Sequence, residues 1–259
     1  MPFADIDGRR IEYRLVPGAE PAMPPLVFLH EGLGSAGLWR DFPDKLARRL
    51  GARALIYSRF GYGASDGLGG IRRTPRFMHA EALDVLPRLL DRIGIGKPLL
   101  VGHSDGASIA LIHASTSGRA VAGVVLMAPH VFVEAVTVQS IARIAERYEE
   151  PDFKRRFAAY HANPDDAFLG WSRIWLDPVF RAWSLGAEAS ALAVPALLMQ
   201  GADDEYGSLA QLDAIAEVAR GPLERCVLAN CGHAPHRDQA AAVIETIAAF
   251  VARHIVRAD

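Results

Sequence analysis

The chain has 259 residues, of which 51% are hydrophobic and 22% are charged, and its formal net charge at pH 7 is -2. This composition indicates an ordinary globular protein with one substantial core, or one core with a small inserted subdomain. The basic clusters are short and the net charge is close to zero, which excludes an extended nucleic-acid-binding surface. No apolar run reaches the ~18 residues that a transmembrane helix needs.

Short apolar runs alternate with longer amphipathic stretches along most of the chain. The first predicted element is a hairpin of residues 3–6 and 11–15 around the turn Asp7-Gly8. The continuous apolar runs that follow are typical of strands buried on both faces, and they cover residues 26–30, 54–57, 99–102, 121–127, 196–200 and 225–228. Apolar residues at helical spacing predict helices over residues 38–50, 76–93, 107–115, 209–220 and 239–254.

Strands that alternate with helices form right-handed βαβ units, so the sequence predicts an α/β fold with a mostly parallel central sheet flanked by helices. Residues 130–192 interrupt this alternation, because no strand is predicted there and every tryptophan except Trp39 lies there. We interpret residues 130–192 as a small helical cap inserted between two strands of the sheet. Residues 1–129 and 193–259 then form the core.

The sequence Gly-His-Ser-Asp-Gly at residues 102–106 carries the strongest chemical signal, because it stands between a predicted strand and a predicted helix. A serine on such a sharp turn needs glycine on both sides, since side chains there would collide with neighbouring backbone. The first N–H groups of the following helix would stabilise negative charge near the serine oxygen. Ser104 is therefore the predicted nucleophile, and the alternative is a glycine-rich turn with an incidental serine.

A nucleophilic serine needs a base, and the C-terminal part of the chain offers two histidines. His233 follows the last predicted strand and a glycine, which places it at the carboxyl edge of the sheet, where sites in open α/β sheets form. His236 is the rival candidate, but it begins the final helix. The two histidines have no third ligand at a suitable spacing, so we expect no metal site and no cofactor.

The base needs a carboxylate to orient it, and three consecutive acids follow the predicted strand at residues 196–200. Asp204 is the first choice, Asp203 the second and Glu205 the third. The alternative is an acidic loop that only caps the following helix.

The negative charge that develops during acyl transfer needs two backbone N–H donors. One is expected from Asp105, the residue after the nucleophile, and the other from the loop after the strand that ends at His30. In that loop Gly32 is the predicted second donor.

Five motifs in chain order resemble the α/β-hydrolase superfamily over nearly the whole chain, and they are residues 30–35, 58–65, 102–106, 201–204 and 232–233. The order of nucleophile, acid and base is also that of these enzymes. The resemblance implies the α/β-hydrolase fold with a cap, a serine hydrolase without cofactors, and Asp204 as the acid, because it stands three residues after Gly201.

Two residues depart from the superfamily pattern. Glu31 stands where most relatives have glycine, and Ser58 stands where many have aspartate. A carboxylate at Glu31 would oppose a developing oxyanion unless it points away from it or is paired with a cation.

The pair Ser104-Asp105 resembles the elbow of valacyclovir hydrolase-like esterases, within the biphenyl-hydrolase-like group. In that group the aspartate is associated with substrates that bear an amino group, and the alternative is an acid that stabilises the start of a helix. Glu31, His130 and Trp175 are further candidates for contact with the substrate. Tryptophans of the cap can instead form its own small core.

A small carboxylic ester is the predicted substrate, and a lactone, a thioester or a carbon–carbon bond is the alternative, because the same catalytic groups serve all of them. A ligand-binding module that has kept the fold is the alternative from another class. The only expected partner is a small-molecule substrate, with neither nucleic acid nor membrane. The N-terminal ten residues lack a secretory signal and the chain has two cysteines, Cys226 and Cys231, which favours a reduced, cytoplasmic setting.

Overall fold

The computed structural model describes residues 1–256 and contains an eight-stranded sheet with the strand order β1-β2-β4-β3-β5-β6-β7-β8. β2 runs antiparallel to both of its neighbours, and every other neighbouring pair is parallel. The predicted α/β-hydrolase fold with a mostly parallel sheet is therefore confirmed. The strands are β1 (Phe3–Ile6), β2 (Arg9–Val16), β3 (Leu26–Leu29), β4 (Ala54–Tyr57), β5 (Leu99–His103), β6 (Gly123–Met127), β7 (Ala196–Gly201) and β8 (Leu223–Leu228).

The hairpin of β1 and β2 turns at Asp7 and Gly8, which both have positive φ, 54° and 80°. Two consecutive positive φ values are the requirement of the tight turn that matches the twist of paired strands. The central strands β3 to β6 are fully buried, as their unbroken apolar runs predict.

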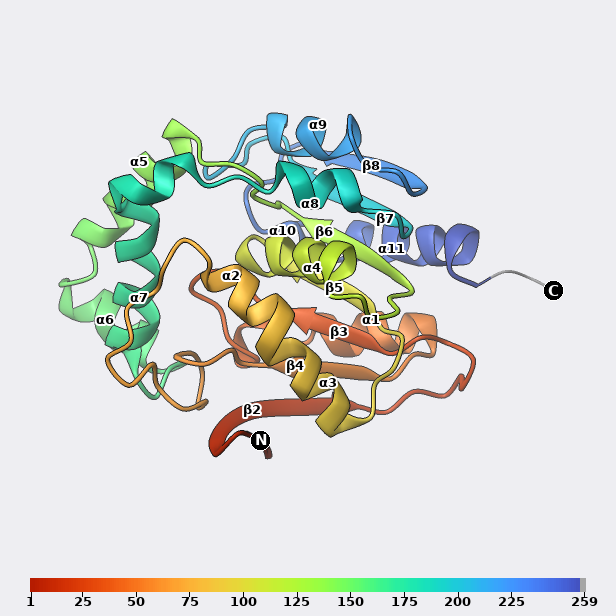
Figure 1. Ribbon diagram of the computed structural model, residues 1–259, viewed down its shortest axis with the longest axis horizontal. Helices are drawn as coiled ribbons and strands as arrows, with labels where there is room; N and C mark the ends of the chain where they lie inside the picture. Colours follow the sequence, from red (N-terminus) through yellow and green to blue (C-terminus); the bar gives the residue numbers. More distant parts are fainter. Residues whose placement is uncertain (257–259) are drawn as a thin grey trace.

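Helices cover both faces of the sheet, and each face buries its own hydrophobic core (Figure 1). Helices α1 and α11 pack together on one face, while α4 lies at the centre of the other, between α2 and α8. The helices of the core are α1 (Phe42–Leu50), α2 (Phe77–Ala80), α3 (Leu86–Ile93), α4 (Asp105–Thr116), α9 (Ala210–Ala216), α10 (Pro235–Asp238) and α11 (Ala240–His254).

The helix predicted over residues 76–93 is continuous in the chain but not regular. A π-helical segment, η2 (Glu81–Val85), separates α2 from α3, and Pro87 lies in the first turn of α3. Proline has no N–H to donate to the preceding turn, so a local change of hydrogen-bonding pattern at this point satisfies the backbone better than a regular helix would.

Residues 130–192 are helical, with α5 (Ala135–Glu146), α6 (Pro151–Ala158) and α7 (Pro164–Leu176) at one end of the sheet (Figure 1). The short helix η3 (Pro178–Ala182) follows, and α8 (Gly186–Ala191) packs against α4 and α9. The last helix of the segment therefore packs on the core helices, and the division into core and cap at these boundaries stays a prediction.

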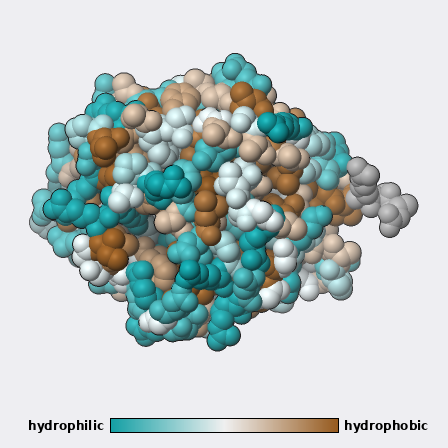
Figure 2. Space-filling view, in the orientation of Figure 1, coloured by the Kyte–Doolittle hydropathy of each residue, from teal (hydrophilic) through white to brown (hydrophobic). Residues whose placement is uncertain are grey.

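The surface mixes hydrophilic and hydrophobic residues, and the face in Figure 2 shows the hydrophobic ones dispersed among hydrophilic neighbours. Scattered exposed apolar residues are normal for a globular protein. Within residues 1–256, none of the helices is both long and apolar enough to cross a membrane.

Candidate active site

Ser104 stands between β5 and α4 on a turn with a strained backbone. Its φ of 53° and ψ of -120° lie in a region that residues other than glycine rarely adopt. A side chain at Gly102 would overlap the backbone of Gly106 and Ala107, and one at Gly106 would overlap the carbonyl of Leu29. The two glycines thus allow the β5–α4 turn to close tightly, and this turn holds the serine at the carboxyl end of β5.

The His233 ring is held by Asp204, which follows the end of β7. The Nδ1 atom of His233 lies 2.8 and 3.0 Å from the two carboxylate oxygens of Asp204. The backbone N–H groups of Tyr206 and Gly207 and the amide of Gln200 also donate to this carboxylate. Burial raises the pKa of Asp204, but the hydrogen bond and charge of His233 outweigh burial, so this pKa lies below its ordinary value.

The rival residues occupy other places. Asp203 is exposed, and its backbone N–H donates to the carbonyl of Cys231. Glu205 accepts a hydrogen bond from the backbone N–H of His233, at 3.2 Å, and so contacts the loop rather than the ring. The His236 ring is buried against Trp39, with 4.6 Å between the ring centroids.

The loop after β3 brings Gly32 to the serine turn. A side chain at Gly32 would overlap the indole of Trp171 on α7, so glycine is required where α7 packs against this loop. Arg59 fixes the loop from the other side, because its guanidinium donates to the carbonyl of Glu31 at 2.8 Å. In the described part of the chain, the backbone N–H groups of Gly32 and Asp105 donate no hydrogen bond to the protein. Both are therefore available to donate to a bound ligand.

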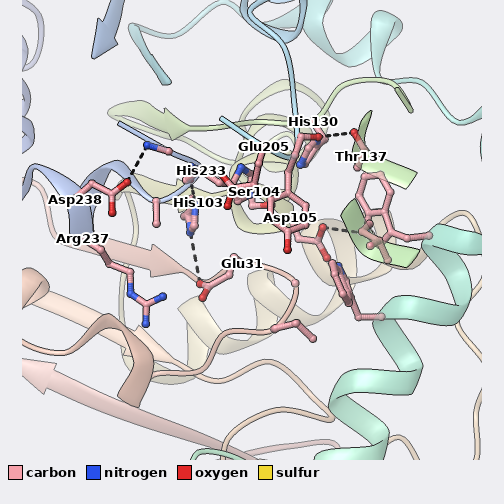
Figure 3. Close-up of a pocket in the computed structure, with 18 residues that line it drawn as sticks. Glu31, His103, Ser104, Asp105, His130, Thr137, Glu205, His233, Arg237 and Asp238 are labelled. Carbon is pink, nitrogen blue, oxygen red and sulfur yellow. Dashed lines mark hydrogen bonds and ion pairs between the residues drawn. The ribbon is translucent and has the colours of Figure 1, made fainter. Parts of the chain in front are cut away.

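These residues meet at a cavity of about 280 Å³ (Figure 3). Of the residues that the sequence predicts for the site, Asp204 alone lies outside the lining, behind His233. The predicted residues that line the cavity are Glu31, Gly32, Ser104, Asp105, His130, Trp175 and His233.

His130 and Trp175 form one wall of this cavity, with 5.2 Å between their ring centroids. His130 is 2% exposed, and burial lowers its pKa to about 3, so its ring is neutral near pH 7. The Trp175 indole donates to Asp105 at 3.2 Å. This bond joins α7 to the first residue of α4, so Trp175 both lines the cavity and fixes α7 over the serine turn.

Comparisons with known proteins identify the family of this chain. The family model described as "Alpha/beta hydrolase family" matches residues 26–246. The chain belongs to the alpha/beta hydrolase family. The match covers most of the chain, and it confirms the superfamily resemblance and the assignment of the chain as a hydrolase.

A 2-succinyl-6-hydroxy-2,4-cyclohexadiene-1-carboxylate synthase from Klebsiella pneumoniae is 26% identical over 256 residues, which cover 92% of this chain and 97% of the relative. Among solved structures, the enol-lactonase from Burkholderia xenovorans has a TM-score of 0.72 at 21% identity, and the match covers 96% of this chain and 99% of the lactonase. A thermophilic esterase from Thermogutta terrifontis has a TM-score of 0.75 at 17% identity, covering 98% and 97%. Likeness at these identities shows a shared fold.

Asp105 of this hydrolase has partners within the protein. Besides the Trp175 indole, the Arg59 guanidinium lies 4.0 Å from its carboxylate, and both charged side chains are buried. Burial raises the pKa of Asp105 above its ordinary value, and the positive charge of Arg59 offsets only part of this rise. These contacts give Asp105 a structural role. It is the first residue of α4, and its carboxylate holds α7 in place through Trp175.

The departure at Ser58 has a structural explanation that the sequence did not reveal. Glu12 on β2 is buried, and its carboxylate accepts hydrogen bonds from the Ser58 hydroxyl, at 2.8 Å, and from the Ala64 backbone, at 2.8 Å. The Ser58 hydroxyl in turn accepts from the Ala36 backbone. A carboxylate from the neighbouring strand β2 thus lies beside position 58, where many relatives have aspartate.

Arg59 is the other important residue that sequence reasoning missed. Its side chain is buried, it stacks on Tyr62 at 4.7 Å, and it donates to two carbonyls of the β3 loop. The signal in the sequence was a charged residue two positions after the end of the buried strand β4, within the motif at residues 58–65. An arginine at that position needs partners when it is buried, and the carboxyl edge of the sheet provides them.

Proposed function

We propose that this hydrolase cleaves a small carboxylic ester through an acyl-enzyme on Ser104. The observation that carries the proposal is the bond between the His233 ring and Asp204, at 2.8 Å, beside a serine on a strained turn in the same cavity. A carboxylate on Nδ1 holds the proton there and leaves Nε2 free to accept a proton.

In the proposed mechanism, His233 takes the proton of Ser104 as the serine oxygen attacks the ester carbonyl. The N–H groups of Gly32 and Asp105 hold the oxyanion of the tetrahedral intermediate. His233 then gives its proton to the leaving alkoxide, which departs as an alcohol. Water repeats the sequence on the acyl-enzyme and releases the acid, while Asp204 keeps the imidazole in one tautomer throughout.

The cavity supports a small and apolar acyl group. Its volume of about 280 Å³ is at the lower end of the range for small-molecule sites. Apolar side chains from the β3 loop and from α5 and α7 supply much of the lining, namely Leu33, Ile141, Trp171 and Trp175.

The charged groups of the cavity disfavour anionic substrates. Arg237 is the one arginine in the lining, it is exposed, and no lysine is present, whereas the acids in the lining are Glu31, Asp105, Glu205 and Asp238. We therefore expect p-nitrophenyl pentanoate to be cleaved with a kcat/KM at least about tenfold above that of p-nitrophenyl hydrogen succinate, which carries a carboxylate at the end of its acyl chain. Steady-state kinetics on the two esters measures this ratio, and equal or faster cleavage of the succinate would contradict it.

A screen of p-nitrophenyl esters, amino-acid esters, lactones and thioesters with the native protein and Ser104→Ala tests the proposed activity. Ester turnover that needs Ser104 supports the proposal. Turnover confined to a lactone, a thioester or a carbon–carbon bond would keep the mechanism and replace the substrate, since the same groups serve all of them. A protein without any serine-dependent turnover would fit a ligand-binding module instead.

A further inference from the structure

Glu31, His103 and His233 form a continuous chain of polar contacts beside the serine turn (Figure 3). The carboxylate of Glu31 lies 3.6 Å from Nδ1 of His103, and Nε2 of His103 lies 2.7 Å from the backbone carbonyl oxygen of His233. His103 immediately precedes the nucleophile, so this chain joins the β3 loop to the base loop across the serine turn. No step of the proposed mechanism uses Glu31 or His103.

The contact of His103 with the His233 carbonyl fixes one proton on the ring, whereas Nδ1 is buried without a hydrogen bond and has Glu31 at the distance of an ion pair. A carbonyl oxygen only accepts hydrogen bonds, so Nε2 of His103 carries a hydrogen. An ionised carboxylate also only accepts, so the 3.6 Å contact of Glu31 with Nδ1 is attractive only in a ring that carries a hydrogen on both nitrogens. Burial raises the pKa of Glu31, but contact with His103 outweighs burial and holds this pKa well below its usual range, so the carboxylate is ionised.

We propose that Glu31 and the buried His103 form an ion pair, in which His103 neutralises the Glu31 charge beside the oxyanion hole and positions His233 through its backbone carbonyl. This inference rests on the proposed function. Glu31 is directly followed by Gly32, the predicted oxyanion donor, and an unpaired carboxylate there would oppose the charge that develops on the substrate. The pair explains how a hydrolase can carry glutamate at this position.

The surroundings of His103 leave Glu31 as its counter-ion. The His103 side chain is 3% exposed, so water screens its charge weakly. The His236 ring lies 4.8 Å from the His103 ring, and burial holds the pKa of His236 well below its usual value, so that ring is neutral. Trp39 and the His233 ring complete the environment, with centroids 6.4 and 5.1 Å from the His103 ring.

A double-mutant cycle with His103→Gln and Glu31→Gln tests the pair. Glutamine at 103 can still donate to the His233 carbonyl but carries no charge, so His103→Gln leaves the Glu31 carboxylate unpaired. We expect His103→Gln to lower kcat about 10- to 100-fold with little change in KM. Adding Glu31→Gln should restore kcat at least about threefold relative to His103→Gln alone, because the unpaired charge is removed.

A second buried histidine, which lies on α4, provides the matched control. His113 is fully buried and bonds to the carbonyl of Ala82, away from the cavity. The change in kcat caused by His113→Gln should be the same with and without Glu31→Gln. If His103→Gln has native kcat, or if its loss is the same in both backgrounds, His103 has only a packing role and the ion pair is refuted.

Nitrogen-15 NMR of the histidine rings tests the pair even if His103→Gln fails to fold. In the native protein at pH 7, one buried ring should have both nitrogens protonated, and in Glu31→Gln that ring should lose one proton. An absence of any doubly protonated buried ring would overturn the proposal. The NMR result does not depend on turnover, so it tests the ion pair separately from the proposed activity. The proposed activity fails if the native protein shows no serine-dependent turnover.

Discussion

Ser104→Ala is expected to lower kcat for ester hydrolysis by about 10⁶-fold, with the substrate still bound. The reason is that the proposed mechanism passes through a covalent bond to this oxygen, and methyl at this position can form none. The strained φ of 53° at Ser104 stays in the variant, so the turn itself should be retained. Steady-state and single-turnover kinetics with a p-nitrophenyl ester measure the loss.

Ser108→Ala is the matched control for this prediction. Ser108 is buried one turn along α4, and its hydroxyl bonds to the carbonyl of His130 at 2.5 Å, so the same atom is removed close to the cavity. We expect Ser108→Ala to lose less than about tenfold in kcat. Similar losses in both variants would mean that the effect of Ser104→Ala comes from packing rather than from a lost nucleophile.

Asp204→Asn is expected to lower kcat by about 10⁴-fold. The backbone N–H groups of Tyr206 and Gly207 both donate to Oδ1 of Asp204, so the oxygen of asparagine will stay on that side. Its amide nitrogen then takes the place of Oδ2, which lies 3.0 Å from Nδ1 of His233. Oδ1 still lies 2.8 Å from Nδ1, but the neutral amide no longer stabilises the imidazolium that forms when His233 takes the proton of Ser104, and its hydrogens face the ring at the second contact.

Asp203→Asn separates this effect from a general loss of charge in the loop. Asp203 is adjacent to Asp204 in the sequence, and its side chain is exposed. Asp203→Asn therefore removes one negative charge, as Asp204→Asn does, but from a different place in the loop. We expect its kcat to stay within about twofold of the native value. A larger loss for Asp203→Asn than for Asp204→Asn would reverse the assignment of the acid. Thermal unfolding of both variants shows whether either loss reflects instability.

The motifs of the site could be predicted from the sequence because each is a local requirement of the backbone. The turn at Ser104 needs Gly102 and Gly106 within four residues of each other, and the buried strands appear as unbroken apolar runs. The contact of Asp204 with His233 could be predicted only as one of three choices. Adjacent acids differ in the direction of their side chains, which depends on how the loop after β7 folds.

Contacts between elements that are far apart in the sequence could not be predicted in the same way. Glu12 is far from Ser58 in the sequence, and the two residues meet because β2 pairs with β4. Trp171 was a candidate for the cap core, and its packing against Gly32 depends on where α7 lies. Glu31 could be recognised as unusual from the sequence alone, but its contact with His103 follows from the parallel pairing of β3 with β5.

In the proposed mechanism, Ser104 is a nucleophile that His233 and Asp204 activate. Reaction of the native protein with a fluorophosphonate probe, followed by peptide mapping, tests this claim most directly, because the probe forms a covalent bond with activated serines and needs no knowledge of the substrate. We predict that the native protein is labelled on Ser104, and that Ser104→Ala is unlabelled. A native protein that stays unlabelled, or a label on another residue, would contradict the claim.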